Sequence, residues 1–156
     1  MNHVTGRTTL VLVSVAWLGL GSPVRAAEEI PIAARGHRVH VSIEKEHGGN
    51  HIMNVVPDGE SNLGDWVGAI DLHVGGAHVV GTMVLTFETG DTLSVSFEQK
   101  WSPHVGDFGG TIGEYVVTGG TGRFHNAAGG GSITAIYLDK KFVEGLIELD
   151  GVIRVP

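Results

Sequence analysis

Apolar residues recur at every second position over most of this chain, in short runs. A β-strand with one buried face shows this period of two, whereas a helix shows a period near 3.6. No run of useful length with the helical period follows the first 26 residues. Each run therefore predicts a half-buried strand whose apolar series faces a core. The clearest apolar series are Val39, Val41 and Ile43; Trp66, Ile70, Leu72 and Val74; Val79, Met83, Leu85 and Phe87; and Leu93, Val95, Phe97 and Trp101.

Glycine-rich or polar segments separate these runs, and further alternating runs follow them. The breaks are at residues 47–50, 57–64, 75–76, 88–91 and 103–110, and the later runs are at 111–118, 132–139 and 142–154. Seven or eight short strands, with a turn roughly every ten residues, are typical of a β-sandwich or a closed barrel. The predicted fold class is therefore all-β and antiparallel.

The first 26 residues have the order of a cleavable signal peptide. Arg7 supplies the positive charge, residues 10–20 form an apolar stretch too short to span a bilayer, and a small-residue site ends at Ala26. We therefore expect a signal peptide at 1–26, a single domain at 27–156, no membrane span in the mature form, and export to the periplasm or out of the cell.

Composition excludes several classes of function. The chain has no cysteine, so it has neither disulfides nor thiolate chemistry. Its formal net charge is −7, and loss of Arg7 and Arg25 with the signal peptide would leave 8 Lys and Arg against 17 Asp and Glu. Such an acidic chain is not expected to bind nucleic acid or anionic membranes. Its nine histidines form no recognised metal-binding motif, so no metal is expected.

The segment Thr118-Gly119-Gly120-Thr121-Gly122-Arg123-Phe124 contains three glycines in four positions. Glycine adopts positive φ without the steric cost that a Cβ brings, so the segment predicts a tight bend with Gly120 and Gly122 at positive φ. No helix with a phosphate-binding spacing follows it, which argues against a nucleotide loop.

This glycine turn, with the strand 114–117 before it and the small residues 127–131 after it, resembles the signature of the allene oxide cyclase-like and dirigent-like family. The resemblance implies an eight-stranded antiparallel β-barrel that encloses a small hydrophobic ligand and acts without a cofactor. It also places Glu44 on a first-strand acid that polarises the substrate in allene oxide cyclase, and it makes a homodimer or homotrimer an option.

The strand 111–118 offers two candidate proton donors. Glu114 is in phase with Ile112 and Val116, whereas Tyr115 is in phase with Val117, so one of the two must face the interior. A buried acid or phenol in an apolar pocket is suited to opening an epoxide or protonating an alkene. The sequence leaves both phases open, and Glu114, Tyr115 and Glu44 are the predicted catalytic residues.

Large apolar side chains on the strands are the predicted substrate-binding residues: Trp66, Met83, Phe87, Phe97 and Trp101. Their aromatic faces could stabilise a developing carbocation, although plain core packing explains the same pattern. The leading hypothesis is a cofactor-free isomerase or lyase acting on a terpenoid or fatty-acid epoxide or a polyene. The alternatives are a lipocalin-like carrier of an apolar ligand and a structural or interaction barrel.

Overall fold

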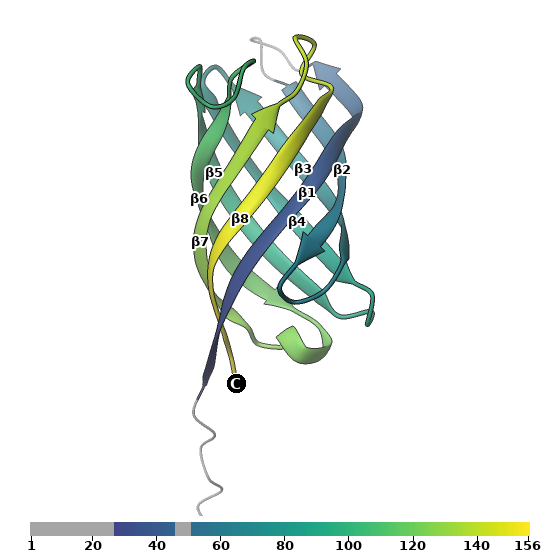
Figure 1. Ribbon diagram of the computed structural model, residues 1–156, viewed down its shortest axis with the longest axis vertical. Helices are drawn as coiled ribbons and strands as arrows, with labels where there is room; N and C mark the ends of the chain where they lie inside the picture. Colours follow the sequence, from purple (N-terminus) through teal and green to yellow (C-terminus); the bar gives the residue numbers. More distant parts are fainter. Residues whose placement is uncertain (1–26, 46–50) are drawn as a thin grey trace, which may run out of the picture.

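The computed structural model describes residues 27–45 and 51–156. In this part of the chain the all-β prediction is confirmed, because eight antiparallel strands close into a barrel (Figure 1). No helix there is long and apolar enough to cross a membrane. The predicted signal peptide and the predicted break at 47–50 lie outside the described residues. The elements are β1 (Glu28–Lys45), β2 (His51–Ser61), β3 (Trp66–Gly75), β4 (His78–Phe87), β5 (Thr92–Ser102), β6 (Gly110–Gly120), the short 3₁₀ helix η1 (Gly122–Phe124), β7 (Ala128–Tyr137) and β8 (Glu144–Val155).

Each strand pairs with its neighbours in sequence, and β1 pairs with β8 to close the barrel. The β3–β4, β5–β6 and β7–β8 connections lie at one end, which we call the upper end (Figure 1). The β2–β3 and β4–β5 turns, η1 and the C-terminus lie at the other, the lower end. Closure leaves no unpaired sheet edge, which favours a barrel over an open sheet of the same strands.

The inward phase predicted for β3, β4 and β5 is confirmed over the middle of each strand. The buried residues from these strands form one apolar core with others from the remaining strands: Trp66, Ile70, Leu72, Val79, Met83, Leu85, Phe87, Leu93, Val95 and Phe97. The predicted turns at 75–76 and 88–91 also join consecutive antiparallel strands. The barrel is therefore filled by side chains over much of its length.

The inward phase predicted for Val39 is wrong. The Val39 side chain is 39% exposed on the outside, and Arg38, at 3% exposure, points inward instead. The β1–β2 register shifts between His40 and Ser42, so β1 contains a bulge. A bulge adds one residue to one strand, and a period of two cannot be extended through it.

The predicted break at 57–64 is also wrong in part, because β2 continues to Ser61. Pro57 is fully buried within this strand. In the β2–β3 pairing, Val55 and Asp58 have partners but the two residues between them do not. Pro57 has no N–H to donate, and it lies where this hydrogen-bond ladder is interrupted. The chain then turns between Ser61 and Trp66.

The glycine turn forms the β6–β7 connection, but one of its two φ predictions is wrong. Gly122 has φ 57° as predicted, whereas the other positive φ before η1 belongs to Gly119, at 141°, and not to Gly120. Gly119 lies where the β5–β6 register shifts, which explains its conformation. Gly120 is required for space instead, because a Cβ there would collide with the carbonyl oxygen of Thr92.

Replacing Gly122 with Val is expected to lower the free energy of unfolding by about 1–3 kcal/mol. The variant would force a branched side chain into positive φ and into the carboxylate of Asp91. Gly76→Ala is the control, because Gly76 has φ 61° but open space around it, and backbone strain alone costs about 1–2 kcal/mol. Urea denaturation midpoints measure both, and an unchanged midpoint for Gly122→Val contradicts the interpretation.

Candidate functional site

The lower end of the barrel is plugged by η1. Phe124 is 0% exposed, and its ring centre lies 5.1 Å from that of Phe87. The Arg123 guanidinium lies over both rings, at 4.7 Å and 4.9 Å, and donates a 2.7 Å hydrogen bond to the carbonyl of Leu63. It also lies 3.4 Å from the carboxylate of Asp91. These contacts tie the plug to the β2–β3 and β4–β5 turns.

The upper end holds an apolar pocket of about 420 Å³, which we call the upper pocket. Three aromatic rings contact one another in its wall: Trp101 and Tyr137 at 5.7 Å, Trp101 and Phe142 at 5.6 Å, and Tyr137 and Phe142 at 4.8 Å between centres. Such a wall suits flat or extended apolar molecules. The lining residues are His51, Met53, Val74, Trp101, Tyr137, Lys141 and Phe142.

The β7–β8 connection brings Phe142 and Lys141 to this pocket. Asp139 accepts hydrogen bonds from the backbone amides of Lys141 at 2.5 Å and Glu144 at 2.8 Å. The amide of Glu144, followed by other amides of the loop, lowers the pKa of the Asp139 carboxyl. Phe142 has φ 59°, a conformation that a non-glycine residue adopts only where its surroundings hold it. The loop is thus shaped by its own carboxylate.

Arg38 lies behind the aromatic wall of the upper pocket. Its guanidinium carbon is 4.4 Å from the centre of the Tyr137 ring, and the whole residue is 3% exposed. Gly145 of β8 makes this possible, because a Cβ there would lie 2.7 Å from Arg38 Nε. A guanidinium stacked on an aromatic face keeps its positive charge inside the barrel.

The structure divides the five predicted substrate-binding residues between different regions. Met83 and Phe97 pack in the core, and Trp66 and Phe87 line a groove at the lower end. Trp101 alone lines the upper pocket, and the expectation that it is buried inside the barrel is wrong, because it is 39% exposed. The prediction that Trp101 points inward was right. However, β5 continues to the open end of the barrel, where an inward-pointing side chain lies at the rim.

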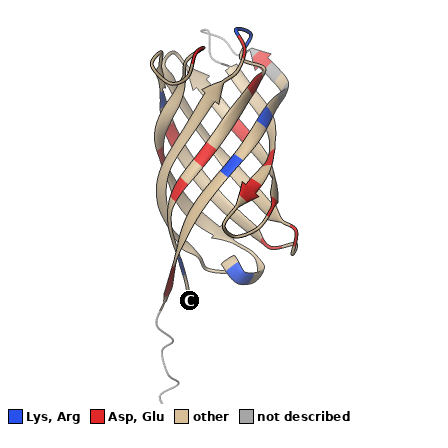
Figure 2. Cartoon of the chain, in the orientation of Figure 1, with Lys and Arg blue, Asp and Glu red and all other residues tan. Residues whose placement is uncertain are grey.

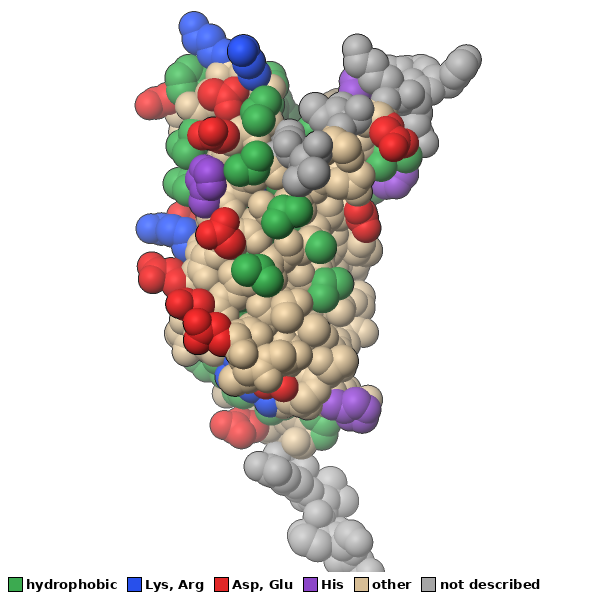
Figure 3. Space-filling view, turned by 90° about the vertical axis from the view of Figure 1, so that its right-hand side faces the viewer, with side chains coloured by type: hydrophobic (Ala, Val, Ile, Leu, Met, Phe, Trp, Pro, Cys, Tyr) green, Lys and Arg blue, Asp and Glu red, His purple; other side chains and the backbone are tan. Residues whose placement is uncertain are grey.

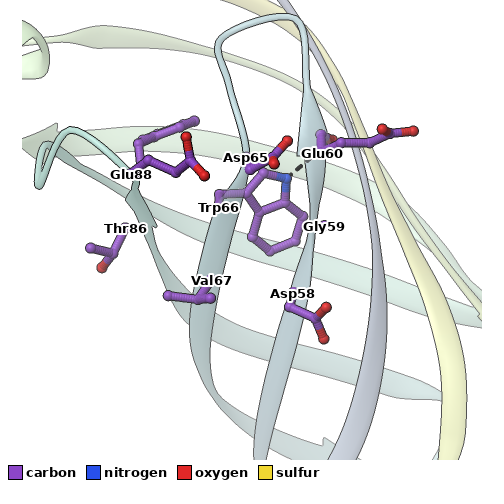
Figure 4. A pocket seen from close by; sticks show the side chains of 9 residues that line it. Asp58, Gly59, Glu60, Asp65, Trp66, Val67, Thr86 and Glu88 are labelled. Carbon is purple, nitrogen blue, oxygen red and sulfur yellow. Dashed lines mark hydrogen bonds between the residues drawn. The ribbon is translucent and has the colours of Figure 1, made fainter.

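The lower groove has a volume of about 550 Å³ and an acidic rim (Figure 4). Trp66 lies beside Asp65, and its indole nitrogen donates a 3.2 Å hydrogen bond to the Glu60 carbonyl. Asp58 and Glu88 also line it. Within residues 27–45 and 51–156, no group of three or more His, Cys, Asp or Glu side chains is arranged to hold a metal ion.

Of the three predicted proton donors, only Tyr115 faces the interior. Glu114 and Glu44 are exposed on the outside, so neither meets the condition of a buried acid. Ile112 and Val116 share the outer face with Glu114, and these exposed apolar residues made the phase of β6 ambiguous in the sequence. Tyr115 does not line the upper pocket, so the structure does not bring it together with Trp101.

Tyr115 is buried without a hydrogen-bond partner for its hydroxyl in the described part of the chain. It is 2% exposed, and burial, with a further contribution from the negative charge of Asp150, raises the pKa of its phenol to about 12. The hydroxyl lies close to the Cα of Gly151, where a Cβ would come within 2.5 Å of it. The phenol therefore stays protonated at neutral pH.

Replacing Tyr115 with Phe is expected to raise the free energy of unfolding at pH 7 by about 1 kcal/mol, because it removes an unsatisfied buried hydroxyl. The raised pKa has a second consequence. Between pH 10 and pH 12 the unfolded chain loses this proton while the folded chain keeps it, so the wild type loses stability as the pH rises through that window. The variant should lack this loss. Urea denaturation at pH 7 and pH 11 measures both, and a less stable variant at pH 7 contradicts the interpretation.

Several residues of the upper pocket were missed by the sequence analysis: Arg38, His51, Met53, Val74, Tyr137, Lys141 and Phe142. One signal was present for Arg38, since it continues the inward series of Ile32, Ala34 and Gly36. Tyr137 and Phe142 flank a turn, where alternation no longer reports which way a side chain points. Only the folded loop brings their rings together.

Comparison with known proteins shows what this barrel resembles. No protein-family model and no curated protein sequence matches the chain. Among solved structures, it matches the pterocarpan synthase dirigent protein GePTS1, at 15% identity and a TM-score of 0.53, over 83% of this chain and 86% of that one. It also matches the pterocarpan synthase dirigent protein PsPTS1, at 16% identity and a TM-score of 0.55, over 82% of this chain and 96% of that one.

The fold is that of the dirigent proteins. The dirigent-like fold that the resemblance implied is thus confirmed, and the likeness to allene oxide cyclase stays a prediction. At this level of identity the likeness to dirigent proteins shows the fold alone, so the chemistry has to be argued from the upper pocket.

Proposed function

We propose that this dirigent-like barrel is a cofactor-free isomerase or lyase that binds a small hydrophobic molecule in the upper pocket. The observation that carries the proposal is the aromatic wall of Trp101, Tyr137 and Phe142 with Arg38 stacked behind it. The substrate we propose is an epoxide of a terpenoid or fatty acid, as the resemblance to allene oxide cyclase implies. The solved relatives are named as pterocarpan synthases, which adds small phenolic compounds to the substrate classes.

In this proposal Tyr137 is the catalytic proton donor. As a C–O bond of the epoxide breaks, its electron pair goes to oxygen, which takes the proton of the Tyr137 hydroxyl. The rings of Trp101 and Phe142 stabilise the positive charge left on carbon. Loss of a proton from the substrate then returns the phenol to its starting state, so the reaction is an isomerisation. Arg38 is a positioning residue, and its charge favours the negative charge developing on the Tyr137 oxygen.

The second candidate function is a carrier of an apolar ligand. Two observations favour it: Glu44 and Glu114 point away from the interior, and no carboxylate of the described residues lines the upper pocket. A carrier needs only apolar walls and an opening, and the pocket has both. A chain exported after loss of residues 1–26, as its sequence predicts, could serve in either role.

The test is a turnover screen with a chain that starts at Ala27. Terpenoid epoxides, fatty-acid epoxides and small phenolic compounds are incubated with the protein, products are identified by mass spectrometry, and binding is measured by titration calorimetry. Turnover of one class supports the enzyme. Binding without turnover supports the carrier, and the absence of both overturns the upper pocket as the functional site.

A further inference from the structure

Among residues 27–45 and 51–156, the upper pocket is lined by Lys141 and by no Asp or Glu, and Arg38 lies behind its wall. His51 also lines it. Figure 2 shows blue at the tip of the β7–β8 loop, and both red and blue along the barrel wall. Figure 3 shows basic side chains projecting at the same end. This is unexpected for a chain with a formal net charge of −7.

Asp139, the acidic residue nearest in sequence to Lys141, does not line the upper pocket. The two Asp139 carboxylate oxygens accept hydrogen bonds from backbone amides of its own loop, including those of Lys141 and Glu144. Glu144 and Glu44 are exposed and do not line the pocket. The lower groove shows the opposite arrangement, because the charged residues that line it are all acidic. The upper pocket and the lower groove therefore differ in the sign of the charged residues that line them.

We propose that the upper pocket selects organic carboxylates, that is, small apolar molecules that carry one acidic group. This rests on the proposed function in so far as the same pocket is the binding site. The apolar body of the ligand packs on Trp101 and Phe142, and its carboxylate lies at the mouth near Lys141 and His51. Arg38 adds positive potential from behind the Tyr137 ring, where the low dielectric of the barrel interior strengthens it.

The charges differ in how much affinity they are expected to contribute. Lys141 is exposed, so its interaction with an anion is screened by water and salt, and its loss should weaken binding about 2- to 5-fold. Arg38 is buried, and loss of a buried charge that interacts with an anion should weaken binding about 10- to 100-fold. Neither loss should weaken the binding of a neutral ligand of the same shape.

The experiment compares phenylbutanoate with phenylbutanol by titration calorimetry at pH 7. The two probes share the aromatic body and differ in the charged group. We expect phenylbutanoate to bind about 10-fold or more tightly than the alcohol, and added salt to weaken only the acid. Lys141→Gln should weaken phenylbutanoate binding and leave phenylbutanol unchanged. Lys140→Gln is the matched control, because Lys140 is exposed on the same loop but does not line the pocket.

A second pair of variants addresses Arg38. Arg38→Lys keeps the charge and should keep most of the preference for the acid, whereas Arg38→Met should remove most of it. If Arg38→Met does not fold, the comparison of Lys141→Gln with Lys140→Gln still tests whether the pocket selects carboxylates. Equal affinity for acid and alcohol, or equal effects of the two lysine variants, overturns the selection of carboxylates but leaves the pocket intact. Binding of neither probe overturns both this inference and the proposed function.

Discussion

Replacing Phe124 with Ala is expected to lower the free energy of unfolding by about 3–5 kcal/mol, the largest stability effect we expect in this barrel. Phe124 is 0% exposed, packs on Phe87 and lies under the Arg123 guanidinium. Its removal leaves a cavity at the lower end and deprives Arg123 of one of its two aromatic contacts. The measurement is the urea denaturation midpoint together with its slope.

His125→Ala is the matched control for this prediction. His125 is the next residue in the chain and is exposed, so its truncation removes no core packing. Surface substitutions of this kind usually change stability by less than about 0.5 kcal/mol. If Phe124→Ala and His125→Ala shift the midpoint equally, η1 does not plug the barrel and the lower end has to be considered as a second opening.

Replacing Tyr137 with Phe is expected to lower turnover of the accepted substrate by about 10²- to 10⁴-fold, the magnitude of general acid catalysis. The ring contacts with Trp101, Phe142 and Arg38 do not involve the hydroxyl, so ligand affinity should stay within a few-fold. Single-turnover rates and calorimetric dissociation constants separate the two effects. A large loss of affinity with unchanged turnover means that the hydroxyl binds the ligand and does not protonate it.

Tyr115→Phe is the control, since it removes the same hydroxyl from the other tyrosine of the chain. Tyr115 is buried in the core and does not line the upper pocket, so its variant should keep turnover within a few-fold of the wild type. The opposite outcome, with Tyr115→Phe inactive and Tyr137→Phe active, would return the donor role to Tyr115, one of the three donors that the sequence predicted. It would also mean that the substrate reaches further into the barrel than the upper pocket.

The sequence by itself determined the strands from β3 to β5 and the turns that join them. In these strands successive side chains point to opposite faces of the sheet, so the position of a residue determines its face. Burial of the apolar side chains, such as Trp66, Met83 and Phe97, determines which face is the inner one. Glycine residues indicated the tight turns, and the reason is also local, because glycine adopts positive φ at little cost. Alternation alone does not distinguish a barrel from a sandwich, and the prediction of a barrel came from the resemblance of the glycine turn.

The tertiary structure decided everything that depends on contacts between distant segments. Arg38 continues the inward series of β1, and barrel closure placed it behind Tyr137 of β7. The outward phase of Glu114 followed from pairing with β5 and β7, because both faces of β6 carry apolar residues. Alternation indicates only how a side chain is oriented relative to its neighbours in the chain. The upper pocket forms where five separate segments come together at the open end of the barrel. No local sequence pattern specifies that arrangement.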